Sequence, residues 1–484
     1  MKKQNIINSL IYLYVFLPIM IFFIGWTRWF ISIPGMLILV FCWYRMSKDR
    51  PVLDLPEWNR KQAETFVFAV LVIFLWVYLS GIGKFVFQNS DHECRNPIFD
   101  ILVNNSWPAT KDIAIDSVTQ TRGLIYYIGF WMPAAVVGKI FGLNAGYCFQ
   151  ALWAVCGIFI FYLLTCSVLK EVKLWPLIVF IFFSGLDILG YFLVNGTFEN
   201  LSAISHIEWW TDFQFSSITT QLFWVFNQAV PAWVIFMLIC RQKKNRYIVV
   251  LLGCTLLCSS LPFIGMLPFV LYFVFSRKYG DQKGKDHWKC WFFDTFTVEN
   301  IVGGGFSGIL TFLYLTGNEA GQNITSGSAD YNKAYLFMYV IFIIIEAGCY
   351  YLAVYPYKKR EPLFYISLIW LCICPWIKIG YANDFCMRAS IPALIILYLM
   401  VAETLRDSWK DKNWLVFVCL MGLFLVGSVT PVHEIMRTTT MTMNAYRNGE
   451  AVSLEGQTED YIFTDCNFSG TADDNFFFKY MGKK

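Results

Sequence analysis

The feature that most constrains this chain is the recurrence of apolar runs of membrane-spanning length. A helix needs about 20 mostly apolar residues to cross the hydrocarbon core of a bilayer, and somewhat fewer where neighbouring helices shelter its ends. Hydrophobic residues make up 57% of the chain and charged residues only 15%, against roughly 25% charged residues in soluble proteins. The sequence therefore predicts a polytopic membrane protein with an all-α fold, a bundle of transmembrane helices.

The apolar runs predict about thirteen spans. These spans are expected at residues 10–26, 30–45, 64–83, 146–168, 174–196, 220–240, 247–260, 263–276, 298–316, 335–355, 363–379, 390–405 and 414–430. Loops on the cytoplasmic side of a membrane carry an excess of Lys and Arg, and with these spans every basic cluster falls on one side. This arrangement predicts a cytoplasmic N-terminus and a C-terminus outside, in a bacterial plasma membrane.

One apolar stretch, residues 123–142, is left out of the spans, because a crossing there would move every later basic cluster to the other side. We expect an interfacial or half-inserted helix on the outer face instead. The first outer loop then covers residues 84–145 and contains interfacial helices. The transmembrane helical domain extends over residues 1–430, and residues 431–484 form a short outer-face tail.

The first outer loop is unusually polar near its beginning. Asp91, His92, Glu93, Arg95 and Asp100 lie within ten positions, shortly after an expected span. A carboxylate at the outer membrane surface can deprotonate an incoming hydroxyl or hold a divalent cation. The alternative interpretation is a solvated loop with ordinary ion pairs.

A second polar concentration, at residues 195–233, surrounds the beginning of an expected span. It contains His206, Glu208, Trp209, Asn227 and Gln228. Aromatic faces beside hydrogen-bonding side chains are typical of a sugar-binding cleft. They are equally typical of the aromatic belt that membrane proteins place at the water interface.

A third concentration is the expected outer loop that contains Lys378, Asp384 and Arg388. The guanidinium of an arginine suits a phosphate or pyrophosphate headgroup. Asp384 and Arg388 are also spaced as an i, i+4 pair on a helix, so an ion pair between them is the alternative.

The order of these features resembles the glycosyltransferase-C superfamily over roughly the first half of the chain. The resemblance lies in an anchor, a large first outer loop with an acidic motif, and the segment LIYYIGFWMPAAVVGKIFG, which is similar to the PLYY...KLFG stretch of the family. The span at residues 147–170 matches the helix that follows that stretch. The chain departs from the pattern by an extra hairpin before the acidic loop and by lacking the proline pair before its two tyrosines.

The resemblance implies a membrane-embedded glycosyltransferase that moves a sugar from a polyprenyl-phosphate donor to a glycan, lipid or protein acceptor at the outer face. Asp91 would then be the catalytic acidic residue, with Glu93 completing an Asp-x-Glu pattern and with Mg²⁺ or Mn²⁺ as the cofactor that Asp91 holds. Arg388, with Lys378 and Asp384, would bind the donor phosphate. The expected substrate-binding residues are Arg95, Asp100, His206, Glu208, Trp209, Asn227 and Gln228.

Other classes of function remain open. A transporter or flippase for lipid-linked glycans predicts ionisable groups within spans, of which Asp187 and Glu346 are examples. A polysaccharide polymerase or ligase predicts essential outer arginines and no essential Asp91, and an inactive scaffold predicts neither. Besides the lipid bilayer and these substrates we expect no nucleic-acid partner, because the basic residues are dispersed and the net charge is only +4.

Overall fold

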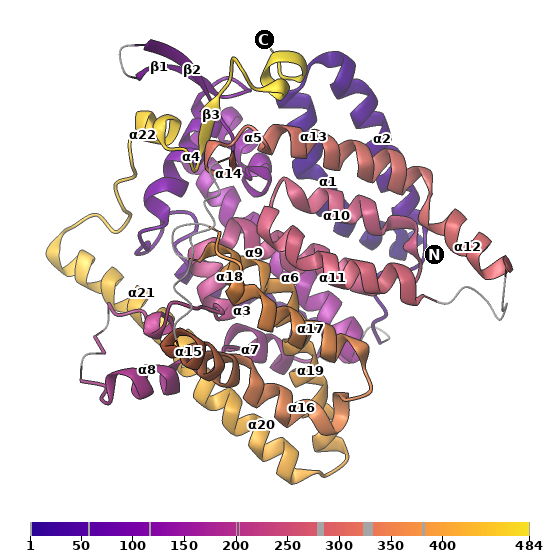
Figure 1. Ribbon diagram of the computed structural model, residues 1–484, viewed down its shortest axis with the longest axis vertical. Coiled ribbons are helices and arrows are strands. Elements are labelled where there is room, and N and C mark those ends of the chain that lie inside the picture. The colour runs from indigo at the N-terminus through magenta and orange to yellow at the C-terminus, as the bar shows by residue number, and fades with distance from the viewer. Residues whose placement is uncertain are drawn as a thin grey trace.

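The computed structural model is almost entirely helical (Figure 1). It describes residues 2–56, 59–115, 118–199, 201–202, 204–277, 285–322, 333–379 and 383–483. Most of the expected outer loop at 316–333, part of the basic cluster at 277–289 and the middle of the 378–390 loop lie outside the described residues.

Within the described part of the chain, seven helices are long and apolar enough to cross a membrane. They are α1 (Lys2–Trp26), α2 (Trp29–Lys48), α3 (Arg60–Leu79), α6 (Leu143–Leu169), α9 (Ile218–Arg241), the helix Lys333–Lys358 made of α15, η5 and α16, and the helix Trp414–Asn448 made of α20 and α21. An eighth span results if α12 (Lys285–Thr295) and the helix Glu299–Leu315, made of η4 and α13, are counted as one helix bent by 41°. The chain is therefore a multi-pass membrane protein.

Shorter elements fill the space between these helices. The shorter helices are α4 (His92–Asn104), η1 (Gly129–Trp131), α5 (Met132–Phe141), α7 (Trp175–Ile181), α8 (Asp187–Asn195), η2 (Ile207–Trp210), η3 (Asn245–Tyr247), α10 (Ile248–Leu256), α11 (Ser260–Ser276), α14 (Glu319–Gln322), α17 (Pro362–Ile373), η6 (Cys374–Trp376), α18 (Asp384–Ala389), α22 (Glu459–Thr464) and η7 (Phe477–Met481). The helix α19 (Ile391–Lys410) is as long as a span, but it carries Glu403, Arg406 and Asp407 in its last turns. The strands are β1 (Thr110–Ile115), β2 (Val118–Leu124) and β3 (Ser469–Thr471).

The predicted helical membrane fold is confirmed, whereas the count of about thirteen spans is not. The run at 174–196, expected as one span, consists of α7 and α8 separated by a non-helical segment around Gly185. Several other expected spans are helices of fewer than 18 residues. The stretch at 123–142 contains the end of β2, a loop and the short apolar helix Gly129–Phe141, which is below spanning length.

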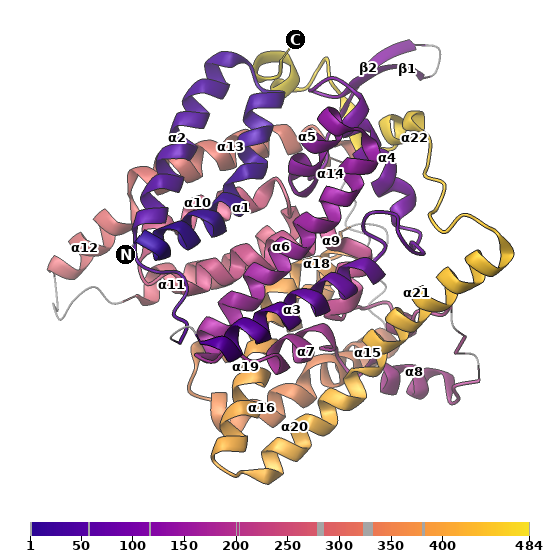
Figure 2. The same ribbon diagram turned by 180° about the vertical axis from the view of Figure 1, so that it is seen from behind.

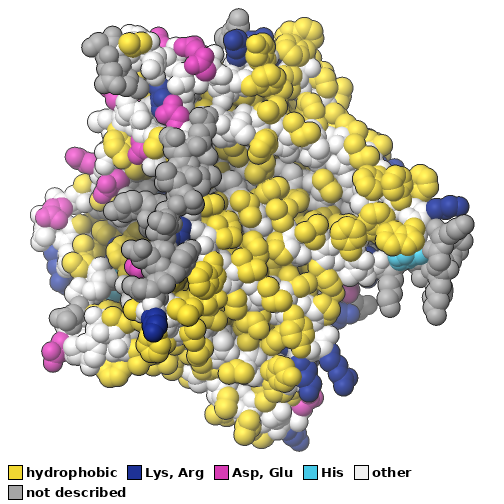
Figure 3. All heavy atoms as spheres, viewed as in Figure 1, with side chains coloured by type: hydrophobic (Ala, Val, Ile, Leu, Met, Phe, Trp, Pro, Cys, Tyr) yellow, Lys and Arg dark blue, Asp and Glu magenta, His cyan; other side chains and the backbone are white. Residues whose placement is uncertain are grey.

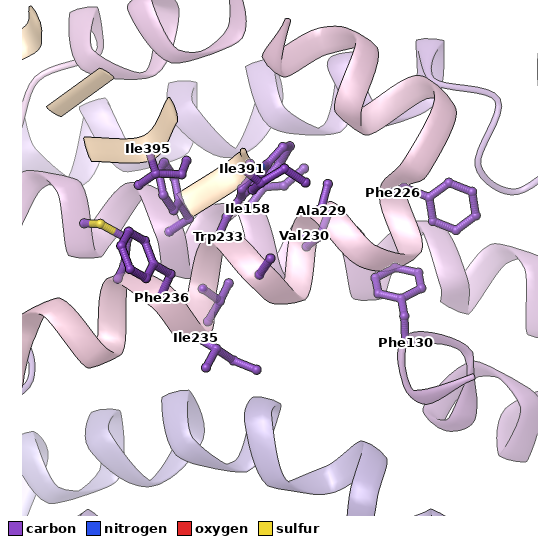
Figure 4. Close-up of a cluster of buried hydrophobic side chains, with 14 of the residues drawn as sticks. Phe130, Ile158, Phe226, Ala229, Val230, Trp233, Ile235, Phe236, Ile391 and Ile395 are labelled. Atoms are coloured by element: carbon purple, nitrogen blue, oxygen red, sulfur yellow. The ribbon is translucent and has the colours of Figure 1, made fainter. Parts of the chain in front are cut away.

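The centre of the molecule is α9, and the most apolar stretch of this helix is completely buried. It packs against α6, α10, α11 and α19, and Figure 4 shows Val230, Trp233 and Phe236 of α9 together with Ile158 of α6 and Ile391 and Ile395 of α19. The indole of Trp233 stacks on Trp76 of α3 at 6.2 Å and donates a hydrogen bond to Gln221 Oε1 at 2.9 Å. Interior side chains of this kind pack as densely as a crystal of small organic molecules, so α9 holds the surrounding helices in place.

The surface shows which parts of the fold face lipid. Large apolar side chains such as Leu37, Leu71, Leu352 and Leu415 are exposed on the outward sides of the long helices, and apolar side chains cover the middle of the face in Figure 3. Acidic side chains gather along the edge formed by α21, α22 and β1–β2, whereas basic ones are most frequent toward the opposite edge. A soluble protein does not expose so much apolar surface, and a bilayer covers it.

The C-terminal segment packs against the first outer loop. β1 and β2 form an antiparallel hairpin, and β3 adds to β2 with Arg122 opposite Thr471. α20 and α21 form one long helix along the edge of the molecule, as the view from behind also shows (Figure 2). Residues 431–484 thus pack against the loop that contains β1 and β2, more than 300 residues earlier in the sequence.

Arg122 holds this junction together. Its buried guanidinium donates to Phe463 O at 3.0 Å, to Ser469 Oγ at 2.8 Å and to both carboxylate oxygens of Glu319, with 2.9 Å to Oε2. These acceptors belong to α14, α22 and β3, all far from Arg122 in the sequence. This one side chain therefore links the three elements to the hairpin.

We expect Arg122→Ala to detach the C-terminal segment. Removing one member of a buried, hydrogen-bonded charge pair costs about 3–5 kcal/mol, and the cost here is expected toward the lower end because Glu319 is partly exposed. Hydrogen exchange of the β3 amides and limited proteolysis of residues 450–484 should both become faster. The exposed Arg447 provides a matched control, because Arg447→Ala should change neither rate. Unchanged exchange in Arg122→Ala would refute this role.

Candidate functional site

The site begins at a break in α9. The backbone of Val225 leaves the helical region, with φ −131° and ψ 34°. The carbonyl of Phe223, two residues before the break, accepts a hydrogen bond from Asn89 Nδ2 at 2.7 Å and lies 3.3 Å from His92 Nε2. A buried carbonyl requires such partners. The break therefore attaches the first outer loop, and the beginning of α4, to the central helix.

Gln88 fixes the conformation of this loop. Its buried amide donates to the carbonyl of Gly81, where φ is +84°, and to His92 Nδ1 at 3.1 Å. His92 therefore carries its proton on Nε2 and donates it to Phe223. Burial first, and the charge of Arg95 second, lower the pKa of His92 from 6.5 to about 3. His92 is thus a neutral residue that positions the loop.

Asp91 lies at the N-terminal end of α4, among two arginines and a second carboxylate. Arg95 Nη2 donates to Asp91 Oδ2 at 2.6 Å, and Arg388 Nη2 lies 3.1 Å from Asp384 Oδ1. Burial raises the pKa of Asp91, but the charges of Arg95 and Arg388 outweigh it and hold that pKa below its usual value. The structure thus brings Arg388 of α18 close to Asp91 of the first loop. It also contains the ion pair of Arg388 with Asp384.

Two tyrosines complete this group, which we call the Asp91 cluster: Asp91, Arg95, Tyr126, Tyr127, Asp384 and Arg388. Tyr126 donates to Tyr127 Oη at 2.6 Å, and Arg388 Nη1 donates to the same oxygen at 3.4 Å. Burial raises the pKa of Tyr127, so it stays a neutral phenol. The two tyrosines were not among the predicted site residues. The one sequence signal for them was the segment LIYYIGFWMPAAVVGKIFG, in which they are adjacent.

Several buried donors of the cluster have no hydrogen-bond partner among the described residues. These are Arg95 Nε and Nη1 and Arg388 Nε. Arg95 also lies over the ring of Phe226, at 5.9 Å. Guanidinium groups with unused donors are suited to bind phosphate oxygens, which accept several charge-assisted hydrogen bonds at once.

Further unpaired polar groups lie next to Phe226, on the two residues that follow it in α9 and on one neighbouring side chain. Asn227 and Gln228 are fully buried, and neither amide has a partner among the described residues. Trp131 Nε1 is also unpaired, and its ring lies 6.2 Å from that of Phe226. Figure 4 shows Phe226 and Phe130 facing each other beyond the break of α9. A buried polar group without a partner is costly, so bound water or a polyhydroxylated ligand would stabilise this region.

Three predicted site residues make their contacts elsewhere. Glu93 contacts the C-terminal segment, where its carbonyl accepts from Gln457 N at 2.7 Å. Asp100 accepts from Tyr147 Oη at 2.6 Å. Lys378 lies over the ring of Tyr335, at 5.2 Å. Each of these contacts is made within the protein, so the three residues have structural roles that need no ligand.

His206, Glu208 and Trp209 belong to a separate group. His206 Nδ1 lies 2.7 Å from Glu434 Oε1, and its Nε2 lies 3.5 Å from Glu208 Oε2. The other oxygen of Glu434 accepts from Trp224 Nε1 at 3.1 Å, and Arg437 lies 3.4 Å from Glu434. Sequence reasoning missed Glu434 and Arg437, because they lie on α21, in the segment 431–484 that was expected to be a short outer-face tail.

Glu208 and Glu434 keep the imidazole of His206 protonated. Glu208 is fully enclosed, accepting from Ser217 N at 2.8 Å and from Thr220 Oγ1 at 2.7 Å. Burial lowers the pKa of His206, but the hydrogen bonds and charges of Glu208 and Glu434 outweigh it and raise that pKa to about 9. The exposed indole of Trp209 covers the imidazole at 4.7 Å. His206 is therefore an imidazolium that joins η2 to α21.

The Asp91 cluster offers two carboxylates, those of Asp91 and Asp384, and each is paired with an arginine. No group of three or more His, Cys, Asp or Glu side chains suited to hold a metal ion occurs within the described ranges. Arg95 and Arg388 also place positive charge beside the Asp91 carboxylate, which opposes the binding of a cation.

Comparisons with known proteins do not identify a relative: no family model, no curated protein and no solved structure matches the chain.

The imidazolium of His206 predicts a pH dependence of stability. Its pKa in the folded state, about 9, lies above the unfolded value of 6.5, so its stabilisation is complete below pH 6.5 and is lost as the pH rises through 9. The difference in unfolding free energy between the wild type and His206→Gln should shrink by on the order of 3 kcal/mol between pH 6 and pH 9.5. Chemical unfolding at both pH values measures it. An unchanged difference would mean that His206 is neutral in the folded protein.

Proposed function

We propose that this protein is a membrane-embedded glycosyltransferase of the glycosyltransferase-C type, using a polyprenyl-phosphate sugar as donor at the outer face. The observation that carries the proposal is the Asp91 cluster itself: Arg95 pairs with Asp91, Arg388 donates to the tyrosine pair, and the charge of Arg388, about 300 residues later in the chain, acts on the Asp91 carboxylate. A carboxylate beside guanidinium groups with unused donors is the combination that transfer from a phosphate leaving group requires.

In this proposal the acceptor hydroxyl donates its hydrogen bond to Asp91. The hydroxyl oxygen attacks the anomeric carbon of the donor sugar, its proton passes to Asp91, and the bond between that carbon and the carrier phosphate breaks. Arg388 and Arg95 stabilise the charge that develops on the departing phosphate, in a site where burial strengthens the interaction. The lowered pKa of Asp91 keeps it ionised and ready to accept the hydrogen bond.

The remaining predicted residues take secondary roles. Asn227 and Gln228, whose buried amides are unpaired, would bind sugar hydroxyls, whereas the contacts of Glu93, Asp100 and Lys378 favour roles in holding the loops. The expected glycan, lipid or protein acceptor, the bacterial plasma membrane and the Mg²⁺ or Mn²⁺ requirement stay predictions. Sugar transfer measured with and without EDTA tests the metal requirement.

We expect Asp91→Asn and Arg388→Ala each to lower sugar transfer by about 100-fold or more, since each removes one group that stabilises the transition state. The assay measures transfer of radiolabelled sugar from a panel of polyprenyl-phosphate donors by the purified protein in detergent. Asp473→Asn and Arg447→Ala remove the same charges at exposed positions and should keep wild-type rates.

Two results would change the assignment. Full activity in Asp91→Asn together with loss in Arg388→Ala would favour a polymerase or ligase that relies on arginines. The absence of transfer with every donor would favour transport, for which the buried carboxyl groups of Asp187 and Glu346 are the relevant feature, since they interact with each other near the break between α7 and α8.

A further inference from the structure

A separate cavity lies at the other end of α9 from the Asp91 cluster. Its volume is about 300 Å³, which is at the lower end of the range of ligand pockets. Three segments form its walls: the first turns of α1, the connection at 49–54 that follows α2, and the turn at 241–247 between α9 and α10.

The lining of this cavity is strongly basic. It includes Arg50, Arg241, Lys243, Lys244 and Arg246, against only two carboxylates, Asp49 and Asp54. The lining therefore carries a net charge of +3.

The two carboxylates already have partners: a residue outside the cavity, the backbone, and the side chain of Tyr247 in the cavity wall. Asp54 lies 3.7 Å from Lys170, and Asp49 Oδ1 accepts from the backbone N of Arg50 at 2.8 Å. The side chains of Arg50, Lys243 and Lys244 form no ion pair with any residue that the structure describes. Their positive charges are therefore available to a ligand.

The walls are held in place by hydrogen bonds. Asn8 of α1 donates to Arg50 O at 3.2 Å and accepts from Val52 N at 3.1 Å. On the opposite wall, Gln242 donates to the buried Tyr12 Oη at 3.1 Å, and Arg241 Nε donates to Val52 O at 3.3 Å. A site with fixed walls loses little entropy when it binds a ligand, unlike a loose set of surface lysines.

The position of the cavity follows from α9. Phe226, beside the Asp91 cluster, and Arg241, in the cavity wall, are 15 residues apart, which corresponds to about 22 Å along a helix. Because α9 is long enough to span a membrane, the two places lie toward opposite membrane surfaces. Figure 1 shows the chain's N-terminal end at the edge of the molecule opposite to α21 and α22.

We propose that this cavity binds a phosphate group, supplied by an anionic lipid headgroup or by a soluble phosphate compound. Arginine and lysine donors grouped around a polar cavity are the usual means of phosphate recognition. The proposal does not depend on the glycosyltransferase assignment, because none of the residues that line the cavity belongs to the Asp91 cluster.

The test compares two triple variants of the full chain. Arg50→Ala/Lys243→Ala/Lys244→Ala removes exposed cations of the cavity, which have no partner to lose. Lys359→Ala/Arg360→Ala/Lys410→Ala removes the same number of exposed cations outside it. Native mass spectrometry measures binding of phosphatidylglycerol, with phosphatidylcholine as the neutral comparison, and calorimetry measures binding of inorganic phosphate.

The cavity variant should bind phosphatidylglycerol, inorganic phosphate or both at least about tenfold more weakly than the wild type, while the control variant should match the wild type. Loss confined to the lipid identifies a headgroup, and loss that includes inorganic phosphate identifies a free phosphate. In the wild type, either ligand should also protect Lys243 and Lys244 from an amine-reactive reagent. Equal losses in both variants, or no protection and no preference for phosphatidylglycerol over phosphatidylcholine, would overturn the proposal.

Discussion

The carbonyl of Phe223, freed where α9 breaks, and the hydrogen bonds that it accepts from Asn89 and His92 are the interaction on which the site depends. α9 is buried throughout, so a broken backbone inside it needs polar partners, and the first outer loop supplies them. His92 is neutral there because burial removes its proton. Its contact sets the position of α4, and α4 in turn sets the positions of Asp91 and Arg95.

The Asp91 cluster combines two arginines with two carboxylates, so its net charge is close to zero although its donors outnumber its acceptors. Arg95 and Arg388 each use some of their N–H groups on a carboxylate or a tyrosine and keep others unpaired. Buried donors without acceptors are costly. A ligand with several anionic oxygens relieves that cost, and this is the physical basis for proposing a phosphate-linked donor.

Particular residues show how far sequence reasoning reached. The spacing of Asp384 and Arg388 indicated an ion pair, which the structure contains, because i, i+4 neighbours meet on any helix. Hydropathy located α1, α2, α3, α6 and α9, but it treated 174–196 as one span, since it does not register a break around Gly185. The partners of His206 were not predictable, because Glu434 is 228 residues away and only packing brings the two together.

The sequence by itself determined that this chain lies in a membrane and where its longest apolar helices run, because the bilayer demands apolar residues and satisfied backbone groups in every spanning segment, and both demands are local. Tertiary structure alone decided which polar residues meet. His206 pairs with Glu434, and Arg122 pairs with Glu319, across segments that are far apart in the sequence, and Arg388 acts through its charge on the equally distant Asp91. Such contacts depend on the arrangement of the whole bundle, which no local pattern encodes.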